Sequence, residues 1–375
     1  MSNMQSKTYQ SVATPKKVLM VCPWDQTIGG VNYIVRQLSE SLPSAGFEPV
    51  YFFPDYNYTH IFEKKNSWGL SSHYYKLPDL NIPKKNYLSL LIGLVLLPRT
   101  IFALSVFIKQ QKIKLINCHY LMGQYFFLAV AAKILNIPFV ISMHGADLPP
   151  LHQAKLYYQV ILKLTLKLSS QVVSCSEAFS EEILSVYPAI QKKLLAISNG
   201  LNINEFNPTP TKENFPHPYI LCVALQVEKK GIDHLLNAFA MIEKKFPTFH
   251  LLLAGYGPLL ESNKRLAKTL AIADRVHFLG SIERDRIQSL YQGATLCVLP
   301  SKQEPFGIAL LEASFYSKAI VASRVGGIPK IIQDGVTGLL FESEKFIHRT
   351  DFSSKLNCIV SVKSHLELSV FFTLS

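Results

Sequence analysis

The sequence has few of the features that point to disulfide bonds, metal clusters or secretion. Its 375 residues include six cysteines, which are widely scattered and form no Cys-x-x-Cys motif, so we interpret them as reduced core residues. Asp-x-Asp is absent, and the nearest acidic patterns, at 283–285 and 342–344, lie among polar residues and are interpreted as solvent-facing charges. Residues 1–16 are polar and lack the apolar run of a secretory signal. We therefore predict a cytoplasmic protein that uses no metal or other cofactor.

Charged residues are also scarce, and acidic ones are scarcer than basic ones. A composition of 49% hydrophobic and 17% charged residues is typical of a folded, core-rich protein, and the length allows two domains. The net charge of +12 is concentrated in the first half: residues 1–199 hold 19 basic and 10 acidic residues, whereas the remainder holds 19 and 16. This asymmetry predicts an anionic partner, either a membrane surface or a nucleic acid.

Lysine pairs at 64–65 and 84–85 lie close to aromatic and apolar residues in this basic half. Those neighbours are Trp68, Tyr74, Tyr75, Tyr87 and the apolar run 88–97. The mixture is more typical of membrane contact than of base recognition, and no compact nucleic-acid motif is present. We predict peripheral contact with an anionic membrane at its inner face and no nucleic-acid partner. Lysines that only keep the surface soluble explain the pattern equally well.

The run from Leu88 to Ile108 has the length and apolar character of a membrane span. Pro98-Arg99 interrupts it near the middle, where an uncompensated arginine would be costly in lipid. We interpret the run as a buried or interfacial helix kinked at the proline, with a membrane span as the alternative.

Short apolar runs alternate with amphipathic segments as far as residue 341. Strands are predicted at 17–22, 50–53, 115–119, 139–143, 171–175, 219–224, 250–254, 276–279, 296–300, 319–322 and 338–341. Helices are predicted at 32–42, 126–135, 156–168, 180–186, 231–246, 259–270 and 287–292. Such alternation indicates an α/β protein with doubly wound parallel sheets. Residues 207–218 are rich in proline and polar side chains and are predicted to link two domains.

The segment from Glu304 to Glu312 places two carboxylates around a Pro-Phe-Gly turn and an apolar helix start. Pro305 fits the first position of a helix, so the amides of Phe306 and Gly307 would be free beside Glu304. Free amides at a helix N-terminus bind anions, and Glu312, two turns further along, could accept hydrogen bonds from a second polyol. A nucleotide sugar has this arrangement of hydroxyls, diphosphate and ribose.

This segment, together with Gly326-Gly327-Ile328-Pro329 and the turn Asp334-Gly335-Val336-Thr337-Gly338, resembles the donor-site signature of the family 4 retaining glycosyltransferases. The resemblance implies the GT-B architecture, in which two Rossmann-like doubly wound parallel-sheet domains face a cleft. It implies a domain at 1–206 on the acceptor side, the linker at 207–218 and a nucleotide-sugar-binding domain at 219–345. The implied reaction moves a sugar, with retention and without a metal, from a nucleotide-diphosphate sugar to a hydroxyl of a sugar, lipid-linked or polysaccharide acceptor.

The resemblance also implies roles for individual residues. Glu304 would bind hydroxyls of the donor sugar, the Phe306 and Gly307 amides the sugar or phosphate, Glu312 the ribose and Lys230 the diphosphate. In the first domain, His144 would approach the transferred sugar. The remaining residues implied to lie at the donor are Gly29 and Gly30, in the glycine loop after the first strand, and Asn199 in an Asn-Gly turn. Attack from the face of the leaving phosphate needs no protein nucleophile.

The sequence departs from the family pattern at two places. The family has an arginine a few residues before the diphosphate-binding lysine, but Ala224 and Leu225 stand there in this chain, and Gln226 is the only uncharged polar neighbour. Residues 346–375 lack the expected closing helices and form an atypical tail, as a frameshift or premature stop would leave it, although a lineage-specific ending is the alternative. The second hypothesis is therefore a catalytically impaired or truncated protein that binds nucleotide sugars or membrane surfaces.

Overall fold

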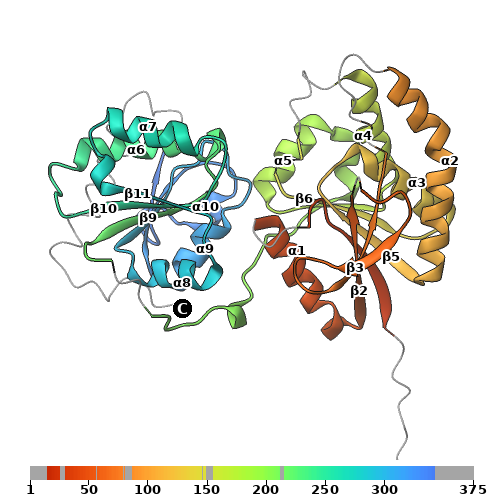
Figure 1. Ribbon diagram of the computed structural model, residues 1–375, viewed down its shortest axis with the longest axis horizontal. Coiled ribbons are helices and arrows are strands. Elements are labelled where there is room, and N and C mark those ends of the chain that lie inside the picture. The colour runs from red at the N-terminus through yellow and green to blue at the C-terminus, as the bar shows by residue number, and fades with distance from the viewer. Residues whose placement is uncertain are drawn as a thin grey trace, which may run out of the picture. The chain divides into compact units, whose positions relative to one another are not determined.

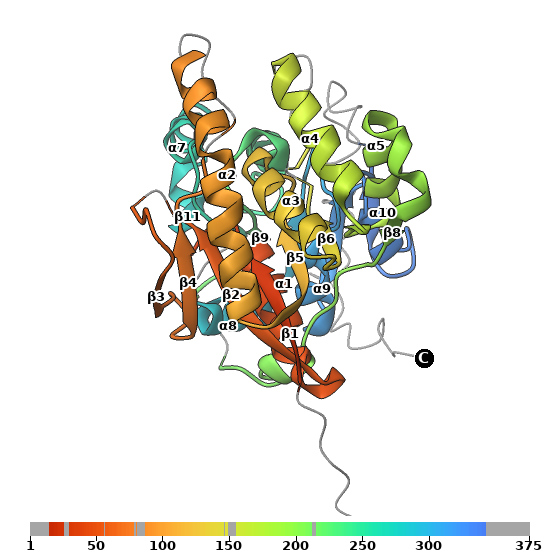
Figure 2. The ribbon, with the colours of Figure 1, turned by 90° about the vertical axis from the view of Figure 1, so that its right-hand side faces the viewer.

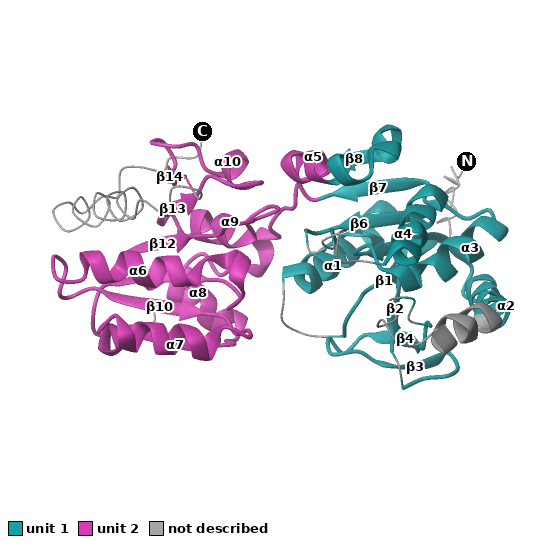
Figure 3. Ribbon diagram, turned by 90° about the horizontal axis from the view of Figure 1, so that it is seen from above, with its two compact units in different colours: residues 1–174, 183–195 teal, residues 175–182, 196–375 magenta. Residues whose placement is uncertain are grey.

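The chain forms two compact units, which are coloured separately in Figure 3. A computed structural model describes residues 15–25, 30–55, 57–78, 80, 87–145, 147–148, 155–211 and 215–342, with only the backbone described at 87–96. One unit comprises residues 1–174 and 183–195, and the other comprises 175–182 and 196–375. Gly29, the lysine pair 84–85 and the predicted tail 346–375 lie outside the described residues.

The first unit is built on an eight-stranded sheet with the order β3-β4-β2-β1-β5-β6-β7-β8. The strands are β1 (Lys16–Val21), β2 (Phe47–Pro54), β3 (Phe62–Lys65), β4 (Ser71–Tyr75), β5 (Ile113–His119), β6 (Phe139–Met143), β7 (Gln171–Ser174) and β8 (Leu194–Ala196). The pairs from β4 through β7 are parallel, as predicted, whereas β3 pairs with β4 in antiparallel register. This β3–β4 hairpin was not predicted, because its residues are mostly polar and lack a continuous apolar run.

Helices α2 (Tyr87–Gln110), α3 (Phe126–Ile134) and α4 (Leu156–Leu168) lie side by side over one face of this sheet (Figure 2). Helix α1 (Gly30–Ser41) joins β1 to β2, and α5 (Glu177–Val186) joins β7 to β8. The apolar run from Leu88 to Ile108 lies within α2, as the predicted helix requires. Pro98 lies inside this helix and does not end it. Among the described residues, no helix is long and apolar enough to cross a membrane.

The aromatic residues that we assigned to a membrane-contact face are largely core residues. Tyr74 and Tyr75 are buried in β4, and Trp68 packs edge-on against Tyr51 and Phe53 of β2. The Nζ of Lys64 lies 4.2 Å above the ring of Tyr74. Lys64 therefore packs on this ring and does not extend into solvent beside Lys65. The interpretation was wrong for these residues because Tyr74 and Tyr75 point to opposite faces of the sheet, and both faces are covered at β4.

The second unit contains a six-stranded parallel sheet with the order β11-β10-β9-β12-β13-β14. Its strands are β9 (Tyr219–Val223), β10 (His250–Ala254), β11 (Val276–Gly280), β12 (Leu296–Leu299), β13 (Ala319–Ser323) and β14 (Leu339–Phe341). Its helices are α6 (Ile232–Ile242), α7 (Leu260–Thr269), α8 (Arg284–Gly293), α9 (Ile308–Phe315) and α10 (Ile328–Ile331). These elements match the predicted alternation closely.

Alternate residues of β9 fill the cores on the two faces of this sheet. Ile220 and Cys222 pack with α6 and α7 on one face, and Tyr219 and Leu221 pack with α8, α9 and α10 on the other (Figure 1). Both faces are therefore buried, which explains why these strands appear in the sequence as continuous apolar runs. All five cysteines in the described part of the chain are free and buried, in agreement with the sequence prediction.

The segment before the predicted linker belongs to the core of the second unit. Phe206 is buried against Phe315 and Tyr316, with ring centroids 5.0 and 6.2 Å apart. The next residue, Asn207, donates its amide hydrogen to the Gln288 side chain over 2.9 Å. These contacts explain why the boundary between the two units lies at residues 195 and 196 rather than in the proline-rich segment.

Three histidines gather at the amino ends of adjacent strands in the second unit. His250 Nδ1 lies 2.8 Å from His277 Nε2, and the ring of His217 stacks on His250 with centroids 4.4 Å apart. Burial, and then the neighbouring histidines, lower the pKa of His250 and of His277. Their folded-state pKa values thus lie below the unfolded value of about 6.5, so stability is lost as the pH falls below that value.

We expect the thermal unfolding midpoint to fall between pH 7.5 and pH 5.0 by less in His250→Gln than in the wild type, because this variant removes one member of the cluster. His60→Gln, at an exposed histidine, is the matched control and should retain the wild-type dependence. Calorimetric scans at the two pH values measure the difference. An equal loss in His250→Gln and in the wild type would contradict the prediction.

Candidate active site

The strand order of the second unit reverses between β9 and β12, and residues that follow these two strands form the candidate donor site. Ile220 and Leu221 of β9 pair with Leu296 and Cys297 of β12 in parallel register. The chain leaves β9 toward the helical turn η5 (Glu228–Lys230) and leaves β12 toward Glu304. Ligands of open α/β sheets bind at the carboxyl ends of strands at such a reversal.

Lys230 and Glu304 meet at this point. The Nζ of Lys230 donates to Glu304 Oε2 over 2.5 Å, and their side chains are only 16% and 8% exposed. The hydroxyl of Ser301 donates to the same oxygen over 3.2 Å, and Ser323 fixes Ser301 by donating to its carbonyl over 2.6 Å. A charge left unpaired at this depth would be costly, so the lysine and the carboxylate form one electrostatic unit.

The backbone holds the two loops against each other. The amides of Lys302 and Gln303 donate to the carbonyl oxygen of Lys229, over 2.8 and 3.2 Å. Gly231 has a φ of +63°, and a Cβ there would overlap the carbonyl oxygen of Pro300. Glycine is therefore required beside Lys230, because only glycine permits this approach to the end of β12.

Helix α9 begins later than we predicted. Its first residue is Ile308, and Gly307 is its N-cap with a φ of +109°, so Pro305 lies in the preceding turn and is not the first helical residue. The left-handed conformation of Gly307 separates the turn from the helix. Within the described part of the chain, the amides of Phe306 and Gly307 donate no hydrogen bond. Two amides without such a bond therefore lie next to Glu304. They belong to the turn and to the N-cap of α9, and not to its first helical turn as predicted.

Gly326 and Gly327 pack closely against the backbone of this turn. A Cβ on Gly326 would overlap the carbonyl oxygen of Glu304, and a Cβ on Gly327 would lie 2.6 Å from that of Pro305. The amide of Gly327 also donates to the Glu304 carbonyl over 3.0 Å. The two glycines are thus needed for backbone packing, which fixes the position of the Glu304 carboxylate.

The Asp-Gly-Val-Thr-Gly turn at 334–338 connects elements of the sheet. Asp334 accepts a hydrogen bond from the amide of Leu340 over 2.8 Å and forms an ion pair with Arg324. The hydroxyl of Thr337 accepts from the amide of Gln333, also over 2.8 Å. The turn therefore orders the start of β14, and its contacts are structural.

Glu312 lies on α9, apart from the Lys230–Glu304 pair. Tyr291 of α8 donates its hydroxyl hydrogen to Glu312 Oε2 over 3.0 Å. Burial raises the pKa of Glu312, while the nearby Arg284 and the Tyr291 hydrogen bond oppose the rise. Arg284 also lies 4.7 Å above the ring of Phe206, so it is not the solvent-facing charge that we predicted, although Glu283 and Asp285 are exposed.

The structure describes Ala224 and Leu225, which stand where the family pattern has an arginine. Ala224 follows β9 directly, and Leu225, the next residue, has 43% of its surface exposed. Gln226 is fully buried, and its Oε1 accepts from Asn263 Nδ2 of α7 over 2.7 Å. Because this amide is held in the interior, Gln226 does not replace the lost cation at the surface.

In the first unit the strand order reverses between β1 and β5, and His144 lies nearby at the end of β6. Its Nε2 lies 3.0 Å from Nδ1 of His119, the last residue of β5. Burial lowers the pKa of His144 to about 4, and burial together with His144 lowers that of His119 well below its usual range. Both rings are therefore neutral at pH 7 and act by hydrogen bonding rather than by charge.

Asp147 fixes the loop that carries His144. Its two carboxylate oxygens accept from the amides of His144, Gly145 and Leu121 over 2.6, 2.7 and 2.8 Å. Burial raises the pKa of Asp147 to about 6 against these hydrogen bonds. His119 was not predicted as a site residue, although its position at the end of β5, the strand next to β6, was a usable signal.

The remaining predicted residues have fewer contacts. Gly30 is the exposed first residue of α1, and Gly29 lies outside the described residues. Asn199 is half-buried in the irregular segment after β8, and its side chain forms no hydrogen bond within the described ranges. Trp24, after β1, contacts Tyr120 edge-on at 5.2 Å, and Tyr120 lies 5.6 Å from the ring of His144. This aromatic pair was not predicted from the sequence.

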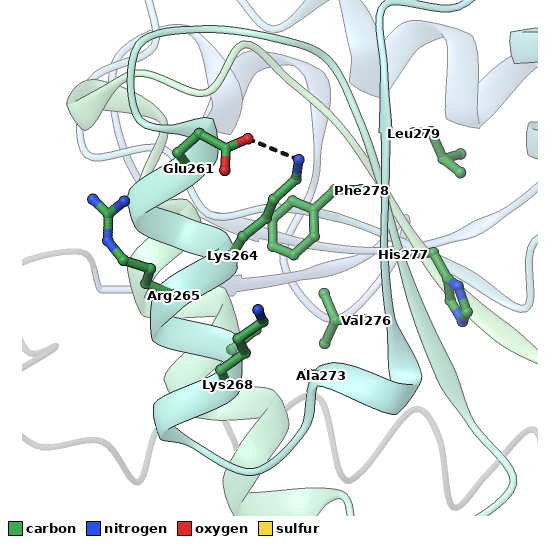
Figure 4. Close-up of a pocket in the computed structure, with 10 residues that line it drawn as sticks. Glu261, Lys264, Arg265, Lys268, Ala273, Val276, His277, Phe278 and Leu279 are labelled. Carbon is green, nitrogen blue, oxygen red and sulfur yellow. Dashed lines mark hydrogen bonds and ion pairs between the residues drawn. The ribbon is translucent and has the colours of Figure 1, made fainter.

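A separate groove lies between α7 and β11, the edge strand of the second sheet (Figure 4). Lys264, Arg265 and Lys268 of α7 line it together with Phe278 of β11. It contains none of the predicted site residues. No group of three or more His, Cys, Asp or Glu side chains suited to a metal is present in the ranges that the structure describes.

Comparison with known proteins agrees with this geometry. Residues 28–205 match the family model described as Glycosyltransferase Family 4, and residues 204–357 match the model described as Glycosyl transferases group 1. An uncharacterized glycosyltransferase of Methanocaldococcus jannaschii is 30% identical over 244 residues, which are 61% of this chain and 62% of that protein. The chain thus spans less than two thirds of this relative's length.

Two further matches extend the comparison. The GDP-mannose-dependent alpha-(1-6)-phosphatidylinositol monomannoside mannosyltransferase of Mycolicibacterium smegmatis is 29% identical over 158 residues, covering 38% of this chain and 41% of its own length. The structure of a sucrose-phosphate synthase from Thermosynechococcus elongatus superposes with a TM-score of 0.69 at 22% identity, covering 93% of this chain and 90% of the other. The fold is that of the GT-B enzymes, and the chain belongs to glycosyltransferase family 4.

Proposed function

We propose that this protein is a retaining glycosyltransferase that moves a sugar from a nucleotide-diphosphate sugar to a hydroxyl acceptor. The observation that carries the proposal is the buried Lys230–Glu304 pair beside the free amides of Phe306 and Gly307. A cation, an anion and two amide donors at the reversal of the strand order suit a ligand that has both hydroxyls and phosphates.

Each group has a distinct task in this proposal. The donor diphosphate takes up hydrogen bonds from Lys230 Nζ, and sugar hydroxyls donate to the Glu304 carboxylate, so the ligand satisfies both members of the pair. The amides of Phe306 and Gly307 stabilise negative charge as the phosphate leaves. Glu312, with one oxygen already bound by Tyr291, offers the other to the ribose hydroxyls.

In the first unit, neutral His144 positions the transferred sugar by accepting or donating a single hydrogen bond. Asp147 holds its backbone and His119 orients its ring, so the imidazole is preorganised. Gly30 and Asn199 retain their proposed places at the donor. The name of the mycobacterial relative states a lipid acceptor, which supports polysaccharide or glycolipid synthesis at a membrane as the setting.

Calorimetric titration with UDP-glucose, GDP-mannose and ADP-glucose, combined with an assay for nucleoside diphosphate release, tests the proposal. We expect one donor to bind and to be turned over, in the presence of EDTA as in its absence. A protein that neither binds nor consumes any donor in a broader panel of nucleotide sugars would refute the proposal.

A second candidate function is binding of nucleotide sugars without turnover. The exposed Leu225 favours it, because the cation that the family has near this position is absent. A charge-assisted hydrogen bond contributes about 1.5 to 3 kcal/mol, and its absence beside the departing phosphate, where negative charge develops, would slow turnover. Donor binding without any release of nucleoside diphosphate would support this candidate over the first.

A further inference from the structure

The outward surface of α2, α3 and α4 carries apolar side chains that the core does not bury. On α4, Leu156, Val160 and Leu164 recur every fourth residue, and Leu156 is 76% exposed. Phe102 and Val106 repeat this spacing on α2, where Phe102 is 70% exposed, and Ile134 at the end of α3 is 64% exposed. The opposite side of α4 packs inward through Leu162, Thr165 and Leu166. Residues four apart lie on one side of a helix, so these side chains form stripes.

Basic residues lie beside these stripes, and the sequences of α2, α3 and α4 contain no acidic residue. Arg99 and Lys109 of α2, Lys133 of α3, and Lys163 and Lys167 of α4 are all exposed. None of the five pairs with a carboxylate among the residues that the structure describes. From residue 80 to residue 176 the sequence contains ten lysines and arginines but one acidic residue, Asp147, which is buried. We call the six apolar and five basic residues the α2–α4 face.

We propose that the α2–α4 face docks on a bilayer of anionic lipids. The three helices lie side by side, so that their apolar side chains can enter the interface between headgroups and acyl chains (Figure 2). The surrounding lysines and arginine then reach the headgroup phosphates, where their long side chains extend from the apolar stripe. Both ingredients of interfacial binding, exposed apolar area and unpaired cations, are present together on this face.

The charge distribution favours a bilayer over a second copy of the chain. Two copies of this face would bring at least ten unpaired cations together without any carboxylate to neutralise them. An anionic bilayer supplies negative charge and an apolar layer at the same time. This inference goes beyond the proposed transfer, since binding to vesicles requires neither a donor nor turnover. Its failure would therefore leave the proposed function intact.

Vesicle flotation tests the proposal with two variants that change the face in different ways. Leu156→Ser/Val160→Ser/Leu164→Ser removes the apolar stripe of α4, and Lys133→Glu/Lys163→Glu/Lys167→Glu reverses three cations. The matched control, Lys244→Glu/Arg265→Glu/Lys268→Glu, makes the same change in net charge at exposed positions of the second unit. Thermal unfolding of each variant checks that the fold is kept, as expected for exposed positions.

We expect the wild type to float with vesicles of phosphatidylcholine and phosphatidylglycerol at low salt, and to bind pure phosphatidylcholine weakly. Each face variant should lose at least about tenfold in partitioning, whereas the control should stay within about twofold of the wild type. Absence of wild-type binding, or an equal loss in the control, would overturn the proposal. A dimer in sedimentation equilibrium that the serine variant dissociates would assign the face to a second copy instead.

Discussion

Glu304→Gln is expected to lower the rate of nucleoside diphosphate release from the bound donor by about a hundredfold or more. Glutamine keeps the shape of the side chain but removes the negative charge that accepts hydrogen bonds from the donor sugar and neutralises Lys230. Loss of one preorganised electrostatic contact in a buried site commonly costs about two orders of magnitude in rate. Initial rates with a saturating donor measure the effect, and calorimetry measures donor binding separately.

The depth of the Lys230–Glu304 pair requires a control for stability. Breaking a buried ion pair leaves one charge uncompensated and destabilises proteins by about 3 to 5 kcal/mol. The double variant Lys230→Met/Glu304→Gln removes both charges and should recover much of the stability without recovering the rate. Glu342→Gln, at an exposed carboxylate, should leave both properties unchanged. A normal rate in folded Glu304→Gln would exclude Glu304 from the chemistry.

Most strands of the parallel sheets could be predicted from the sequence because they are buried on both faces. Runs such as His250–Ala254 and Phe139–Met143 agree with the structure at both ends, since continuous apolar strands leave little ambiguity about their limits. The β3–β4 hairpin could not be predicted in this way. Its strands Phe62–Lys65 and Ser71–Tyr75 are short, and the exposed residues of β3 give no strong period.

The candidate site was predictable as a set of residue types but not as a set of contacts. Lys230 and Glu304 are 74 residues apart, and only the adjacency of β9 and β12 brings them within 2.5 Å. Likewise, His119 becomes a neighbour of His144 only because β5 pairs with β6. Local reasoning placed Pro305 at the start of a helix, since it could not foresee that packing against Gly326 and Gly327 holds the segment as a turn.

Leu225→Arg is expected to tighten donor binding by about tenfold to a hundredfold. The residue follows β9 at the edge where Lys230 meets Glu304, and its exposed side chain leaves room for a longer one. An arginine there could form a bidentate, charge-assisted contact with the diphosphate, worth about 1.5 to 3 kcal/mol, and each 1.4 kcal/mol changes the dissociation constant about tenfold. Calorimetric titration of the variant with the donor that binds the wild type measures the gain.

Two comparisons separate a specific contact from a general increase in charge. Leu195→Arg adds the same cation at an exposed leucine of β8 in the other unit and should leave the dissociation constant within about twofold of the wild type. Titration with the parent nucleoside in place of the nucleotide sugar removes the phosphates, and the advantage of Leu225→Arg should then disappear. An unchanged dissociation constant for the nucleotide sugar would show that position 225 does not face the diphosphate. A gain in affinity accompanied by faster release of nucleoside diphosphate would show that the leucine limits catalysis in the natural chain, because the added charge would then act on the departing phosphate as well as on the bound donor.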